Sequence, residues 1–274
     1  MSLNYASLIC AAALTVVAVS ACNSDSSSSR PATDDELMQY LVGSNLRFGM
    51  AHDLIRDTDT ITQTCLFGSR YRDEWDDETD AFLGYWDREQ EILLPPHAEL
   101  ECLSWRWNDD LIPVKTNGSE LAERAMDEIE RVFNRHVFDR HSIANVPDDE
   151  IDAGIIVSMG TSPVPDGADP RAFCANVAVG PNDLSPISNN IWQDDASYEI
   201  DFPVFINLGN PDCSPNLNIV IHEFGHAMGL EGHFPGFGMG GAISNNFWLV
   251  LFSLYNNPPG TREQDLLLHR PFGF

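Results

Sequence analysis

The sequence predicts an α+β fold for most of the chain. Four strand-like apolar runs, one amphipathic helical segment and one helical segment that carries histidines lead to this expectation. The strand-like runs are residues 111–115, 153–158, 175–179 and 203–208, and the connections between them are rich in Pro, Gly, Asn and Asp. A chain of 274 residues with 43% hydrophobic residues is long enough to bury one large core.

The first run and the segment after it predict a strand followed by a long helix. Pro113 lies inside the run 111–115, which favours a short strand at a sheet edge, because proline removes a backbone donor. Asn117 and Glu120 have the spacing of a helix-capping pair. Apolar residues then recur at helical spacing, and they are Leu121, Ala125, Ile129, Val132 and Phe133.

A second helix is predicted near residue 215. Ser214 is a good N-cap and Pro215 a good first helical residue, and the apolar pattern continues from there toward Gly229. Residues 233–241 are glycine-rich and predict irregular structure. The run 247–255, FWLVLFSLY, predicts a buried helix that ends before two consecutive prolines. Apart from this helix, the C-terminal part is expected to be largely irregular.

The N-terminus has the features of an export signal. The first 21 residues have no charged side chain and an apolar run too short to span a membrane, so we expect a signal peptide over residues 1–21. The sequence Val-Ser-Ala-Cys that ends at Cys22 resembles the lipobox of bacterial lipoproteins, which implies that Cys22 is lipidated and that residues 22–33 are a flexible tether. Asn23 favours the outer membrane. We therefore expect an extracytoplasmic, lipid-anchored protein at the periplasmic face or the cell surface; an ordinary cleaved signal is the alternative.

Acidic residues dominate the charged side chains. The 42 Asp and Glu against 15 Lys and Arg give a formal net charge of −27, which argues against nucleic acid as a partner and leaves the lipid anchor as the membrane contact. An acidic run at residues 73–80 offers oxygen ligands for calcium but lacks the spacing of a calcium loop, so a solvated acidic face is favoured. We expect an acidic N-terminal extension over residues 34–103 and the main domain over residues 104–274.

Four cysteines remain once the signal peptide and Cys22 are set aside. They are Cys65, Cys102, Cys174 and Cys213. An even number of cysteines in an exported chain favours two disulfides, and pairing within each segment gives Cys65–Cys102 and Cys174–Cys213. Buried free thiols are the alternative. No C-x-x-C spacing is present, which argues against zinc binding by cysteine.

His222, Glu223, His226 and His233 all fall within residues 222–233, HEFGHAMGLEGH. His222 and His226 are one helical turn apart, so both imidazoles can bind one ion, and Glu223 lies beside them, near enough to hold water. Zinc with three protein ligands and an open position lowers the pKa of its bound water to about 7 and polarises a carbonyl group. We therefore expect one catalytic Zn²⁺, with Glu223 as the general base.

This pattern resembles that of the metzincin metallopeptidases, and of their matrixin-like branch in particular, H-E-x-x-H-x-x-G-x-x-H. The histidines, the glutamate and Gly229 fit it residue by residue, and the glycine permits the sharp turn after the helix. The third ligand of the family falls at Gly232, which has no donor side chain. The resemblance therefore implies His233 as the third ligand, with one extra glycine in the turn; Glu231 is the alternative.

The resemblance also implies an exported zinc-dependent endopeptidase that acts on a protein or peptide substrate. Its fold is a twisted mixed sheet with a long helix, an active-site helix and an irregular C-terminal subdomain. In such a fold the last strand before the zinc helix is an edge strand that pairs with the substrate, and residues 204–208 would take that place. Metzincins place a methionine in a turn beneath the metal, where Met239 is the candidate; a plain glycine-rich loop is the alternative. No cysteine switch is recognisable around Cys65.

Two other functions are compatible with the motif. A gluzincin-type peptidase takes its third ligand from a glutamate on a later helix, and Glu263 is the only glutamate after Glu231, without a helical E-x-x-x-D pattern around it. A non-catalytic extracytoplasmic metal-binding lipoprotein is the other, but a structural metal site has no need of Glu223 beside its histidines. The remaining histidines lack ligand spacing with one another; they are His52, His97, His136, His141 and His269.

Overall fold

The computed structural model describes most of the chain from residue 31 onward. The described ranges are 31–46, 71–76, 78–79, 81–87, 90–96, 98, 102–108, 111–187, 198–239 and 243–273. The predicted signal peptide, Cys22 and Cys65 lie outside the described residues. No described helix has the length and the apolar character needed to cross a membrane.

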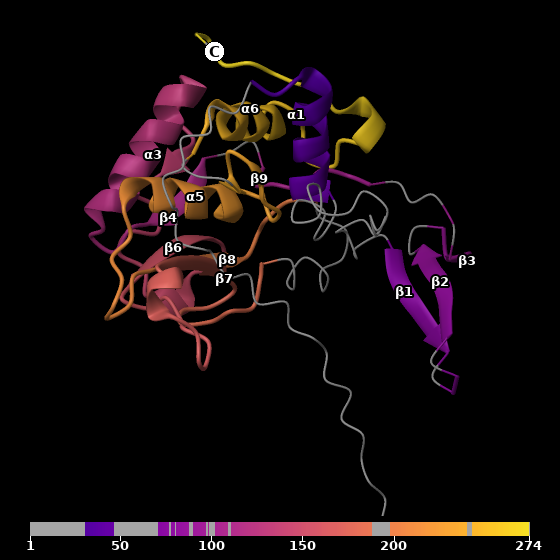
Figure 1. Cartoon of the computed structure of the whole chain (residues 1–274), viewed down its shortest axis with the longest axis horizontal. Coiled ribbons are helices and arrows are strands. Elements are labelled where there is room, and N and C mark those ends of the chain that lie inside the picture. Colours follow the sequence, from indigo (N-terminus) through magenta and orange to yellow (C-terminus); the bar gives the residue numbers. More distant parts are fainter. Residues whose placement is uncertain are drawn as a thin grey trace, which may run out of the picture.

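A five-stranded mixed sheet forms one layer of the molecule (Figure 1). Its strands follow the order β5-β4-β6-β8-β7, and only the pair β7 and β8 is antiparallel. The strands are β4 (Ile112–Lys115), β5 (Phe138–Asp139), β6 (Gly154–Met159), β7 (Ala175–Ala178) and β8 (Pro203–Leu208). The prediction of helices combined with a mixed sheet is therefore confirmed.

The positions of two strands within the sheet differ from the prediction. β4 pairs with β5 on one side and β6 on the other, and it tolerates Pro113 because the pairing with β6 begins only at Val114. β8 was expected at the edge but lies between β6 and β7, so the expectation for residues 204–208 is wrong. Five of its six residues are buried, as is usual for an interior strand. The edge strand next to β8 is β7.

The long helix α3 (Glu120–Phe133) forms as expected, but a different residue caps it. The hydroxyl of Ser119 accepts a hydrogen bond from the Ala122 amide, so Ser119 is the N-cap. Asn117 instead adopts a left-handed conformation in the preceding turn, and its side-chain amide donates to the Val157 carbonyl. The predicted pair of Asn117 and Glu120 is therefore wrong.

The histidine-bearing helix α5 (Leu217–Ala227) begins two residues later than the sequence predicts. Its N-cap is Asn216, whose side-chain oxygen accepts from the Ile219 amide at 3.1 Å, and not Ser214. The apolar helix α6 (Asn245–Leu254) is confirmed and is capped by Ser244. The short pieces that complete the C-terminal part are β9 (Phe234–Pro235), β10 (Gly238–Met239) and a turn of 3₁₀ helix at Glu263–Asp265.

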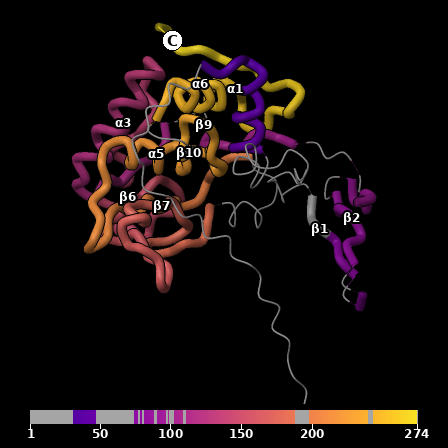
Figure 2. The backbone as a smooth tube through the Cα atoms, viewed as in Figure 1, coloured from indigo at the N-terminus to yellow at the C-terminus, as the bar shows by residue number. Residues whose placement is uncertain are grey.

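The N-terminal helix α1 (Asp34–Leu41) begins with a capping box between Thr33 and Glu36 and continues into a π-helical turn, Val42–Leu46. It lies beside α6 (Figure 2). Leu37 and Leu41 are almost completely buried in the same core as the helices of the main domain. Residues 34–46, which the sequence analysis assigned to the extension, therefore share a core with residues 104–274.

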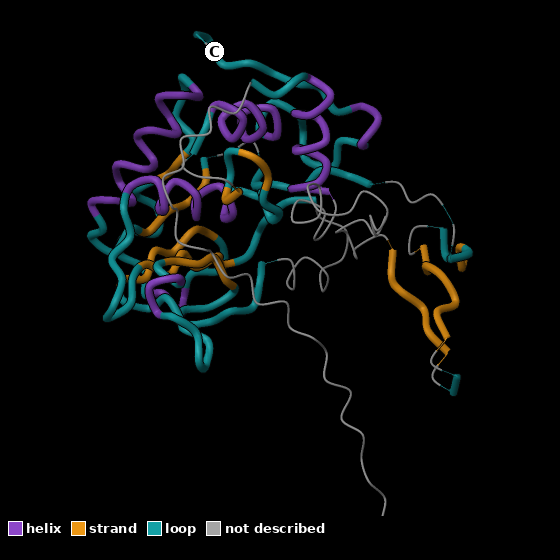
Figure 3. Tube along the Cα trace, in the orientation of Figure 1, coloured by secondary structure: helices purple, strands orange, loops and turns teal. Residues whose placement is uncertain are grey.

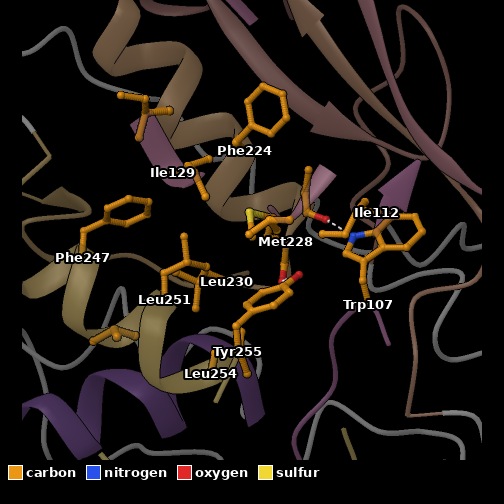
Figure 4. Close-up of a cluster of buried hydrophobic side chains, with 14 of the residues drawn as sticks. Trp107, Ile112, Ile129, Phe224, Met228, Leu230, Phe247, Leu251, Leu254 and Tyr255 are labelled. Carbon is orange, nitrogen blue, oxygen red and sulfur yellow. Dashed lines mark hydrogen bonds between the residues drawn. The ribbon is translucent and has the colours of Figure 1, made fainter. Parts of the chain in front are cut away.

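The core lies between the sheet and the helices. α3 and α5 lie against one face of the sheet, and α6 with α1 lies on the other side of α5 (Figures 1 and 3). Phe224 of α5 lies near Ile129 of α3, while Leu230, in the turn after α5, lies near Leu251 of α6 (Figure 4). A smaller cluster of Ile151, Ile156 and Phe205 covers the opposite face of the sheet. The histidine-bearing helix thus lies between the sheet and the layer of α6 and α1.

Part of the predicted extension forms a separate antiparallel sheet of β1 (Tyr71–Asp76), β2 (Ala81–Asp87) and β3 (Ile92–Leu94). The acidic run falls on β1 and its turn, where the Asp76 carboxylate accepts from the amides of Glu78 and Thr79. Among the described residues, no cluster suited to a metal ion includes a carboxylate of this run.

One predicted disulfide is confirmed. Cys174 and Cys213 are bonded, and the bond ties the start of the edge strand β7 to the segment that leads into α5. Cys102 is disulfide-bonded as well. The pairing of Cys102 with Cys65 stays a prediction.

Candidate metal centre

α5 carries three of the predicted site residues, and they lie within about one turn of the helix. His222 and His226 are four residues apart and project from the same face, with Glu223 beside them. His222 and Glu223 are buried, at 7% and 2% exposure, and His226 is half-buried. His233 approaches from the loop after the helix and is 5% exposed.

The three histidines form a triangle of nitrogen atoms. The Nε2 atoms of His222 and His226 lie 3.0 Å apart, and that of His233 lies 3.1 Å from each of them. Tetrahedral ligands about 2.0–2.1 Å from a zinc ion are about 3.3–3.4 Å from one another, so the triangle is close to the size that zinc requires. Three imidazoles also suit copper, nickel and iron, so the nitrogen set alone does not select one metal.

A main-chain contact sets the orientation of one ring. Nδ1 of His226 lies 2.5 Å from the carbonyl oxygen of Leu230. Because a carbonyl only accepts, Nδ1 carries the hydrogen, and Nε2 carries the lone pair that can bind a metal ion.

Burial also keeps the neighbouring groups uncharged. Desolvation lowers the pKa of His222 well below 6.5, and the nearby His226 and His233 lower it further, so the ring stays neutral and able to bind metal. Desolvation raises the pKa of Glu223 from 4.5 to about 8. The structure gives the Glu223 carboxyl group no hydrogen-bond or ion-pair partner among the described residues.

The turn after α5 depends on Gly229, which adopts φ +111°, a conformation that disfavours other residues. A Cβ atom at this position would also lie 3.1 Å from the Trp105 carbonyl oxygen. The predicted role of Gly229 in a sharp turn is therefore confirmed.

Four side chains bind four successive carbonyl groups, from the last residue of α5 through the turn after it. The indole of Trp107 donates to Ala227 at 2.8 Å and the hydroxyl of Tyr255 to Met228 at 3.0 Å (Figure 4). The Gly229 carbonyl accepts from Asn45 at 2.7 Å, and the next carbonyl is the one bound by His226. This set of contacts fixes the path of the chain between the second and third histidines.

Phe237 supports the three histidine rings from one side. Its ring centroid lies 4.4 Å from that of His222, 4.8 Å from that of His226 and 5.6 Å from that of His233, and Phe237 has no exposed surface. Gly225 makes room for it, since a Cβ there would lie 2.8 Å from the Phe237 ring. Met239, the predicted methionine beneath the metal, lies in β10, and its side chain is outside the part that the structure describes.

The structure brings together His222, His226 and His233, with Glu223 on the same turn, as predicted. Neither Glu231 nor Glu263, the alternative third ligands, belongs to the cluster of possible metal ligands among the described residues. Phe237 and Asn45 were missed by the sequence analysis. The glycine inside the HEFGH helix was a signal of close packing, whereas nothing in the sequence around Asn45 indicated a contact with Gly229.

Comparison of this chain with protein-family models, with curated proteins and with solved structures finds no match. Three imidazole nitrogens converge on one point, and the buried carboxyl group of Glu223, which has no partner among the described residues, lies next to His222 on the same helix. Such a set can hold one metal ion and can transfer a proton beside it.

Proposed function

We propose that the protein is a zinc-dependent endopeptidase, of the metzincin type that its motif resembles. The observation that supports this most strongly is the pairing of the histidine triangle with Glu223. Burying a carboxyl group without a partner costs free energy, and such groups are concentrated at functional sites. A site that only holds a metal gains nothing from a glutamate placed there, which argues against a purely structural metal.

His222, His226 and His233 hold the ion, and three protein ligands leave one coordination position open, as in catalytic zinc sites. Zinc bound there would acidify a water molecule and polarise the carbonyl group of the scissile peptide bond. Glu223 accepts the proton of the attacking water and delivers it to the leaving amine. The pKa of about 8 in the metal-free protein is favourable for taking up and releasing a proton near neutral pH.

The substrate is an extended segment of protein or peptide that pairs with the edge of the sheet. Among the described residues, β7 pairs on one side only, with β8, and its other edge is the place for an added strand. α5 contacts β7, so a peptide held there lies alongside the helix that carries the site. This assignment replaces β8, which has neighbours on both sides.

The proposed enzyme is exported and held at a membrane through lipid on Cys22. The disulfide between Cys174 and Cys213 supports export, because such bonds persist in oxidising compartments. The net charge of −27 supports a partner that is neither nucleic acid nor an anionic membrane surface.

The test is hydrolysis of a reduced and alkylated protein by the purified chain, with new internal termini identified by mass spectrometry. Cleavage is expected with zinc, should stop when zinc is removed by a chelator, and should return when zinc is added. One bound zinc per chain with no new termini would contradict the proposal and favour a metal-binding lipoprotein instead.

A further inference from the structure

We infer that Ser44 and Asn45 hold the loop that carries His233, so that the N-terminal segment 34–46 is a structural part of the metal centre. The inference rests on the proposed function for its consequence, because the loop matters for chemistry only if His233 binds metal. It assigns two positioning residues that lie far from the H-E-x-x-H motif in the sequence.

Asn45 connects two distant parts of the chain. Its side-chain amide donates to the carbonyl groups of Trp105 and Gly229, each at 2.7 Å, and its side-chain oxygen accepts from the Trp105 amide at 3.2 Å. The Trp105 indole in turn donates to the Asn45 carbonyl. Asn45 has no exposed surface, so these bonds are shielded from competition with water.

Ser44 binds the next part of the same loop. Its carbonyl oxygen accepts from the amides of Glu231 at 2.8 Å and Gly232 at 3.2 Å. These two residues directly precede His233. Together, Ser44 and Asn45 therefore fix Gly229, Glu231 and Gly232 to the N-terminal segment.

The loop needs such support because it lies beyond the helix. Gly232 has no side chain to pack, and the extra residue it adds gives the loop more conformations than a shorter turn has. The N-terminal segment itself is held by stacking of Tyr40 on Phe234, with ring centroids 5.2 Å apart. Phe234 directly follows His233, so the segment contacts the chain on both sides of the third histidine.

The consequence is a coupling between two events. Docking of segment 34–46 orders the loop and places His233 at the triangle, and release of the segment frees His233 while His222 and His226 stay on their helix. Metal affinity should therefore depend on residues that touch neither the metal nor its ligands.

Asn45→Ala tests the coupling, and Asn257→Ala is a matched control. Asn257 is also buried, donates to two carbonyl groups, those of Ser253 and Leu267, and accepts from one amide, that of Leu267. It belongs to the segment after α6 and makes no bond to the loop at 229–233. Both substitutions remove three hydrogen bonds from a buried site, so loss of general stability should be similar.

The first measurement is hydrogen exchange of the Glu231 and Gly232 amides in the full chain without metal. We expect exchange at least about tenfold faster in Asn45→Ala than in wild type, and little change in Asn257→Ala at equal global stability. Unchanged exchange in Asn45→Ala, or equal acceleration in both variants, would overturn the inference. If Asn45→Ala does not unfold cooperatively, Trp105→Phe replaces it, since it removes the indole bond to the Asn45 carbonyl, keeps the Asn45 side chain and its bonds, and should give a smaller change of the same direction.

The second measurement is the visible absorption of the Co²⁺-loaded chain, which reports the ligands of the ion. The spectrum of Asn45→Ala should shift toward that of His233→Ala, with affinity about 10- to 100-fold weaker, while that of Asn257→Ala stays as in wild type. A wild-type spectrum in Asn45→Ala would contradict the inference. A wild-type chain that binds no metal contradicts the proposed function alone, and the exchange comparison then decides the inference by itself.

Discussion

Nδ1 of His226 lies 2.5 Å from the carbonyl oxygen of Leu230, four residues further along the chain. One histidine thus both presents Nε2 to the metal centre and binds the turn that leads to His233. The second and third candidate ligands are thereby linked through the main chain. A change at either one should affect the position of the other.

Glu223→Gln should abolish hydrolysis without removing the metal. The amide cannot accept a proton, and general-base catalysis contributes on the order of 10²–10⁴-fold to rate. The measurement is the cleavage rate together with zinc content per chain. Glu231→Gln is the matched control, because it lies close to the site and outside the ligand cluster, and it should keep most of the activity. A Glu223→Gln protein with full activity would refute the assigned role.

His233→Ala should weaken zinc binding by more than about 100-fold. Loss of a residue that only hydrogen-bonds to a metal ligand costs up to about 100-fold in affinity, and loss of a ligand itself should cost more. The reason is that two histidines on one helix cannot complete the three-ligand set. Competition with a coloured chelator measures the affinity. His141→Ala, a change at an exposed histidine outside the cluster, should bind zinc as wild type does. Equal affinities for the two variants would remove His233 from the site.

Phe237→Ala should lower both stability and metal affinity, since it removes the ring that packs against all three histidines. The stability cost of emptying such a buried site is about 3–5 kcal/mol. Phe133→Ala, at a similarly buried ring between α3 and α6, should cost comparable stability and leave metal affinity unchanged. Denaturant unfolding and zinc competition measure the two quantities. An unchanged affinity in Phe237→Ala would limit the ring to a packing role.

The stability of the metal-free protein should depend on pH through Glu223. Its pKa rises from 4.5 to about 8 on folding, so between these values the native state holds a proton that the unfolded state has lost. Stability contributed by this group therefore falls as pH rises from 4.5 toward 8. At about 1.4 kcal/mol per pH unit, the wild type should lose a few kcal/mol relative to Glu223→Gln across this window.

The comparison with Glu223→Gln isolates this group. The lowered pKa of His222 has the opposite sign, since stability is lost as pH falls below 6.5, and it is present in both proteins. Denaturant unfolding at several pH values gives the difference. If the free energy of unfolding changed with pH in the same way in both proteins, the pKa of Glu223 would be the same in the folded and unfolded states.

The main strands and helices after residue 110 could be predicted because each has its own local pattern, whereas α1, β1, β2, β3 and β5 were not predicted. The four strand-like runs and the amphipathic helix α3 appear where the sequence places them. The order of the strands could not be predicted, since side-chain alternation does not say which strands pair. The helix cap was misplaced because Ser214 and Asn216 are both capable caps, and the choice depends on which side chain reaches the Ile219 amide.

The candidate site also has one part that local sequence predicts and another part that it does not. His222, Glu223 and His226 are neighbours on one helix, so the sequence alone brings them together. The contacts that position the turn after this helix come from distant parts of the sequence, because Asn45 is 60 residues from Trp105 and 184 from Gly229. Contacts of this kind depend on the packing of α1 against α6, which no local pattern specifies.

In the proposed enzyme one zinc ion is bound by His222, His226 and His233, and His233 lies one residue later than the third ligand of the metzincin pattern. Anomalous diffraction at the zinc edge, from crystals of the zinc-loaded chain, tests it most directly. We expect a single peak within about 2.0–2.1 Å of the Nε2 atoms of all three histidines. A peak bound by Glu231 or Glu263 in place of His233, or no peak at the triangle, would contradict it.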